Sequence, residues 1–84
     1  MKITPTPVRA LRPGQWVAVN YRNADRETWV QCEEVRQVVR HRDNRTATVH
    51  TDYSLHQYMS GEARVVDERF GPLPLATFLK ETAS

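Results

Sequence analysis

The chain has 84 residues, a length that fits one domain with a small hydrophobic core. Hydrophobic residues make up 39% of it and charged residues 26%, a balance that excludes a disordered polypeptide. The net charge is only +2, weaker than the basic charge that is typical of a dedicated nucleic-acid-binding protein.

A single cysteine, Cys32, excludes an internal disulfide and predicts a reducing compartment, the cytoplasm. The first residues lack the apolar stretch of a secretory signal, and no apolar run is long enough to cross a membrane. We therefore expect no membrane partner. Lys2 and Lys80 are the only lysines among 12 basic residues. This preference for arginine is typical of GC-rich genomes and points to a bacterial or phage source.

Residues 1–12 contain Pro5 and Pro7, which exclude a helix and predict an extended arm. The arm carries Lys2, Arg9 and Arg12 and no acidic residue, so its net charge is +3. Two interpretations stay open. It is either a basic arm that lies on a partner, or an edge segment or loose tail of the fold itself.

A Pro-Gly turn then leads into an alternating segment over residues 15–21, which predicts the first strand of the body. On that strand Val17, Val19 and Tyr21 share one face, and the side chains between them share the other.

Residues 28–42 fit two patterns. As a strand, the segment changes phase at Glu33 and Glu34, which a β-bulge would produce. As a helix, it places Trp29, Cys32 and valines downstream near one stripe. Its β-branched residues and its neighbouring strands favour the strand.

The remaining chain reads as short strands separated by polar turns, followed by a helical end. Residues 71–74, Gly-Pro-Leu-Pro, end the last strand, and Leu75, Phe78 and Leu79 form one apolar face of one or two helical turns. That face packs on the body or docks a partner. The expected elements are a turn at 43–44, strands at 46–51, 55–59 and 63–70, turns at 52–54 and 60–62, and a helix at 75–81.

The segment Leu-Arg-Pro-Gly-Gln-Trp-Val-Ala-Val at residues 11–19, with the strand order after it, resembles the Src-homology-3-like small barrels, including the Tudor and KOW groups. The resemblance covers residues 11–70 and concerns the fold. It implies a mainly-β protein built on a single small five-stranded barrel. In this interpretation residues 1–12 are an extended arm, residues 13–70 the barrel, and residues 71–84 a tail or short helix. No functional residue is carried over from these groups.

Arginines are the strongest candidates for binding. Arg36, Arg40 and Arg42 share strand parity and Arg45 follows across a turn, so a basic stripe is expected there. Guanidinium groups grip phosphates or carboxylates with two parallel hydrogen bonds, and nearby aromatic rings stack bases or anchor protein interfaces. The predicted binding residues are Arg9, Arg12, Tyr21, Arg36, Arg40, Arg42, Arg45 and Tyr53.

Neither a metal site nor a catalytic motif is indicated. The three histidines and Cys32 lack the close paired spacing of zinc ligands, and no nucleophile or nucleotide-binding motif occurs. Glu33 and Glu34 are adjacent on a strand and so point to opposite faces, which favours a charged hairpin surface over an acid pair. We expect no cofactor and no enzymatic activity.

The leading hypothesis is a non-enzymatic protein-interaction module, a small phage or bacterial accessory protein. The alternative is a DNA- or RNA-binding small barrel that uses the arginine-rich hairpin. Free strand edges would also allow a homodimer.

Overall fold

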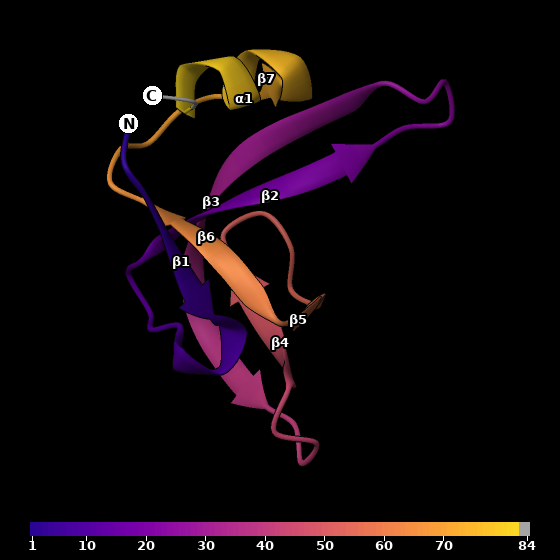
Figure 1. Ribbon diagram of the computed structural model, residues 1–84. Helices are drawn as coiled ribbons and strands as arrows, with labels where there is room; N and C mark the ends of the chain where they lie inside the picture. The colour runs from indigo at the N-terminus through magenta and orange to yellow at the C-terminus, as the bar shows by residue number, and fades with distance from the viewer. Residues whose placement is uncertain (83–84) are drawn as a thin grey trace.

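The architecture is mainly β, with seven antiparallel strands and one C-terminal helix, in a computed structural model that describes residues 1–82 (Figure 1). The mainly-β prediction and the predicted C-terminal helical turns are thus confirmed; residues 83–84 of the predicted tail lie outside the described residues. The elements are β1 Ile3–Pro7, a 3-10 turn Val8–Ala10, β2 Trp16–Arg22, β3 Thr28–Arg40, β4 Thr46–Thr51, β5 Gln57–Ser60, β6 Glu62–Val66, β7 Leu73–Pro74 and α1 Leu75–Thr82.

Strand β3 organises the sheet because it belongs to both of its halves. Its first part pairs with β2 and its second part pairs with β4, with a register shift between Val35 and Gln37. The segment is therefore a bulged strand and not a helix, as the β-branched residues predicted. The bulge lies just beyond Glu33 and Glu34. At this point the Gly14 and Val35 amides donate to the Val35 and Gln15 carbonyls, both at 2.8 Å, which ties the Pro-Gly turn to the bend.

The sheet does not close into a barrel, so the five-stranded barrel prediction is wrong in both closure and strand number. The strand order is β1-β6-β2-β3-β4-β5, and β7 adds to β3 off this path. β6 pairs with β2 only from Trp16 to Ala18, after which the two strands separate. Within residues 1–82, β5 pairs with β4 alone. The extra strands, β1 and β7, are Pro-containing edge segments, where a missing amide donor is tolerated.

The N-terminal segment is extended as predicted, and of the interpretations left open the edge segment is confirmed: residues 3–7 are part of the sheet and not a separate arm. All five residues of β1 pair with β6. Val8 and Leu11, each only 1% exposed, then bury their side chains in the core. Burial of two branched apolar side chains removes them from water and fixes the segment on the body.

Two hydrophobic clusters lie on opposite faces of β2. Val17 and Val19 face the cluster that contains Val35 and Val49. Ala18, on the other face, meets the cluster that includes Phe78 of α1. The predicted two faces of β2 are thus both covered. The helix face predicted from Leu75, Phe78 and Leu79 packs on the body through fully buried Phe78, while Leu79 remains half exposed.

Candidate interaction surfaces

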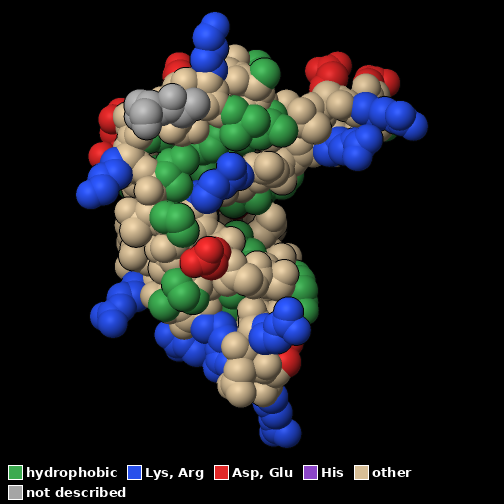
Figure 2. Space-filling view, viewed as in Figure 1, with side chains coloured by type: hydrophobic (Ala, Val, Ile, Leu, Met, Phe, Trp, Pro, Cys, Tyr) green, Lys and Arg blue, Asp and Glu red, His purple; other side chains and the backbone are tan. Residues whose placement is uncertain are grey.

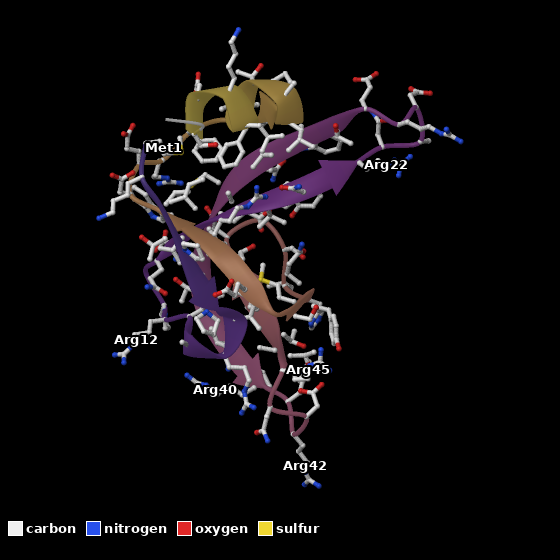
Figure 3. All side chains as sticks on the ribbon, viewed as in Figure 1. Met1, Arg12, Arg22, Arg40, Arg42 and Arg45 are labelled. Carbon is white, nitrogen blue, oxygen red and sulfur yellow. The ribbon has the colours of Figure 1, made fainter. Side chains whose placement is uncertain are left out.

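Five of the eight predicted binding residues gather at one end of the molecule. Arg40, Arg42 and Arg45 come from the end of β3 and the turn into β4, and residues 8–12 bring two more arginines alongside them (Figure 3). The Arg40 Nε donates to the Arg9 carbonyl at 2.6 Å, and the Arg9 Nη1 donates to the Asn44 Oδ1 at 2.8 Å. Basic side chains crowd this lower end in Figure 2. We call this surface the basic end: Arg9, Arg12, Arg40, Arg42 and Arg45.

No arginine of the basic end forms an ion pair with a carboxylate of the described residues. The ion pairs formed within residues 1–82 involve the N-terminus, Arg36 and Arg69, and none involves an arginine of the basic end. Because all but Arg9 are exposed, their guanidinium donors are open to a partner.

Asp43 lies inside this surface but is committed to the turn that carries it. Its carboxylate accepts from the Arg45 and Thr46 amides at 3.0 and 2.9 Å and from the Thr46 hydroxyl at 2.7 Å. These bonds, led by that of the Arg45 amide, lower the pKa of Asp43 to about 2. The next residue, Asn44, has a φ of 62°, a left-handed conformation that asparagine tolerates. The predicted turn is confirmed, and Asp43 holds it.

A shallow hollow of about 490 Å³ lies against the basic end. Leu11, Pro13 and Val38 line it together with Arg12 and Arg40. The hollow thus combines apolar surface with two cationic groups. That combination suits a side chain whose stem is apolar and whose end is anionic.

Arg36 does not belong to the basic end, so the predicted stripe is broken. Its guanidinium pairs with the Glu34 carboxylate at 3.5 Å. The physical reason is the bulge between Val35 and Gln37, because one extra residue changes which face the later side chains occupy.

The two predicted tyrosines lie together, but apart from the basic end. Tyr21 stacks on Trp29 with 5.6 Å between ring centroids and meets Tyr53 edge-on, also at 5.6 Å. Trp29 and Arg40 lie near opposite ends of β3, separated by about 35 Å along the strand at 3.3 Å per residue. We call these three rings the aromatic cluster.

Beneath the aromatic cluster lies a buried carboxylate that the sequence analysis placed on the surface. Glu33 is 1% exposed, opposite Val17 in the β2–β3 pairing. It accepts hydrogen bonds from the Tyr21 hydroxyl and, at 2.6 Å, from the Thr51 hydroxyl. Burial, followed by this contact with Glu33, raises the pKa of Tyr21. The signal that could have found this site is strand parity, since Glu33 shares the face of buried Val35.

The groups considered for metal or thiol chemistry serve the fold. Within residues 1–82 no three histidine, cysteine, aspartate or glutamate side chains lie close enough to hold a metal ion. Burial raises the pKa of the Cys32 thiol. His41 contacts the Thr46 and Thr48 hydroxyls at 2.7 and 2.8 Å.

No helix among the described residues is long and apolar enough to span a membrane. Comparisons with protein-family models, with curated proteins and with solved structures find no match.

Proposed function

We propose that the protein is a non-enzymatic interaction module whose basic end binds an acidic surface of a partner protein. The observation that carries the proposal is the convergence of five arginines from two separate segments without a carboxylate in ion-pair contact. The fold holds this surface in place through Val8 and Leu11, which are buried beside it.

The chemistry of the basic end suits a protein carboxylate. Guanidinium groups form paired, charge-assisted hydrogen bonds with carboxylates, and arginine is enriched among the residues that dominate binding energy at protein interfaces. The apolar lining of the adjacent hollow adds surface that a partner side chain can bury.

Nucleic-acid binding is the second candidate, because phosphates are gripped by the same guanidinium geometry. Two observations favour the protein partner over it. The net charge is only +2, and the aromatic cluster that could stack bases lies far along β3 from the basic end.

We also propose a distant kinship with the Src-homology-3-like small barrels, as an open form. The support is the order β6-β2-β3-β4-β5 and the bent strand shared between both halves of the sheet. A role as a small bacterial or phage accessory protein in the cytoplasm is part of this proposal. A homodimer paired through free strand edges is the alternative to a partner protein at those edges.

A pair of double variants tests the basic end. Arg42→Glu with Arg45→Glu changes two exposed arginines at the β3–β4 turn, and Arg22→Glu with Arg26→Glu changes two at the β2–β3 tip. Each substitution changes the charge by −2, so both variants go from +2 to −2. The tagged full chain is used to capture proteins from the source cell, and each captured protein is then purified and titrated.

We expect a captured acidic protein to lose at least tenfold in affinity for the Arg42/Arg45 variant and to keep its affinity for the Arg22/Arg26 variant. Equal losses of affinity in the two variants would mean that only the net charge matters, which would contradict the proposal. Single- and double-stranded nucleic acids are titrated in parallel at ~50 mM salt, where electrostatic binding to phosphates is strong. If either nucleic acid binds more tightly than any captured protein, the basic end is a nucleic-acid-binding surface and the protein-partner proposal is wrong.

A further inference from the structure

A second surface opens where the sheet fails to close. Within residues 1–82, the edge of β2 that faces away from β3 has no strand partner beyond Ala18, and the outer edge of β5 has none either. Between them lies a hollow of about 280 Å³, lined by residues of β2, β5 and β6. We call this hollow the seam. The β2–β3 hairpin, whose strand β2 contributes to the lining of the seam, projects away from the body (Figure 1).

We propose that the seam binds a short extended segment of a partner protein, which adds as a strand along β5 or β2 and places a carboxylate on Arg64. This site is separate from the basic end, so the two proposals can fail independently.

Unpaired strand edges supply the backbone part of the recognition. A strand edge presents amide and carbonyl groups that an extended peptide can satisfy, and such addition gives affinity through the main chain. In the described part of the chain, no backbone hydrogen bond between β5 and β2 crosses the seam.

Apolar side chains supply the second part. Val19, Met59 and Ala63 line the seam, and Tyr58 at its border is 66% exposed. Alternate side chains of an added strand would contact this lining, since successive side chains of a strand point to opposite faces. The seam therefore favours a segment with apolar residues at every second position.

Arg64 supplies the charge. Its guanidinium donates to the Asn20 Oδ1 and lies 5.1 Å from the centre of the Phe78 ring, but no carboxylate among residues 1–82 pairs with it. Arg64 is half buried, and a cation with little water around it gains more from a carboxylate than an exposed one does. Glu62 lines the same hollow without pairing to Arg64, and its charge opposes an acidic ligand.

The test begins with selection of linear peptides from a random displayed library against the full chain. We expect the selected peptides to carry Asp or Glu among alternating apolar residues. On binding, those amides of residues 57–60 or 19–22 that are not already paired with β4 or β3 should become protected from hydrogen exchange, as in a newly formed strand pair. Failure to select any peptide, selection of peptides without acidic residues, or protection confined to other segments would overturn the proposal.

Variants of the seam then separate charge from packing. Arg64→Met keeps an unbranched apolar stem over Phe78 and should weaken peptide binding about 10- to 100-fold, as expected for a lost charge-assisted hydrogen bond. Arg64→Lys should retain much of the binding, and Glu62→Gln should tighten it. Equal affinity of the wild type and Arg64→Met would contradict the role of Arg64.

Two controls identify the occupant. The Arg42→Glu/Arg45→Glu variant should bind the selected peptide as the wild type does, because the basic end is not part of the seam. If the free protein is a dimer whose residues 57–60 are already protected, the seam belongs to a second copy of the chain, and the peptide proposal is wrong.

Discussion

The basic end and the aromatic cluster contain the residue types that most often form binding sites, yet the molecule uses them differently. In the aromatic cluster the polar group of Tyr21 is bound to buried Glu33 and its ring lies between two others. In the basic end four of the five side chains are exposed, and no carboxylate of residues 1–82 pairs with any of them. A polar group bound to a buried partner within the chain stabilises the fold, whereas an exposed guanidinium without a carboxylate partner keeps donors available to a ligand.

If this comparison is correct, stability depends on the part of the molecule that contains α1 and the aromatic cluster. The largest effect is expected for Phe78→Ala, because Phe78 is fully buried between α1 and the sheet. Loss of a buried phenylalanine costs about 3–5 kcal/mol of unfolding free energy, most of the stability expected for so small a domain. Chemical denaturation measures it. Leu79→Ala, at a half-exposed neighbour on the same helix, is the matched control and should cost far less.

Tyr21→Phe isolates the hydroxyl that binds Glu33. Its removal leaves a buried carboxylate with one donor fewer, which should cost about 1–3 kcal/mol of unfolding free energy. Tyr53→Phe makes the same chemical change on a largely exposed ring and should alter stability by less than about 0.5 kcal/mol. Similar losses of unfolding free energy in the two variants would show that the hydrogen bond from Tyr21 to Glu33 does not stabilise the fold more than an exposed hydroxyl does.

Asp43 stabilises the β3–β4 turn that carries the basic end, because its carboxylate accepts three hydrogen bonds there. Its folded pKa of about 2 lies below the ordinary value of 3.8 for an aspartate, so the carboxylate stabilises the folded state fully above pH 3.8. This contribution is lost as the pH falls toward 2. Denaturation of the wild type and Asp43→Asn over that range should show a stability difference that shrinks with falling pH. A difference that stays constant down to pH 2 would contradict the role given to the carboxylate.

The smallest effect on stability is expected for the arginines of the basic end. Arg42→Glu should change the unfolding free energy by no more than about 0.5 kcal/mol, since the side chain is exposed and unpaired within residues 1–82. Thermal and chemical denaturation measure this directly. A large loss would show that the fold itself uses this arginine, and the comparison would fail.

The strands were predictable because they depend on a short-range pattern, the alternation of apolar and polar residues. The two faces of β2 followed from the period of its apolar residues. The period of β3 fitted a helix as well, and its strand character was predicted from its β-branched residues and its neighbouring strands. Closure was not predictable, because it depends on where β2 and β6 separate, a long-range property with no local pattern. An edge segment was one of the interpretations offered for residues 1–12, but its pairing with β6 is also long-range and was not predicted.

The candidate site was predictable in part. The grouping of Arg40, Arg42 and Arg45 was predicted from strand parity and the turn between them. Arg36 was predicted in the same group, but the one-residue bulge separates it from the other three. The meeting of Arg9 with Arg40 joins residues 31 positions apart, which no local pattern encodes. Glu33 was predicted on a charged surface because of its charge. Its strand parity, which it shares with buried Val35, indicated the core face instead, and it lies opposite core residue Val17.

The most direct test of the central claim is a backbone amide titration of the full chain with a polyglutamate peptide, at ~50 mM salt so that screening is modest. We expect the largest shift changes on residues 9–12 and 40–46, and we expect them to vanish in Arg42→Glu/Arg45→Glu but to persist in Arg22→Glu/Arg26→Glu. Shift changes centred on Tyr21 and Tyr53, or equal in both variants, would contradict the claim.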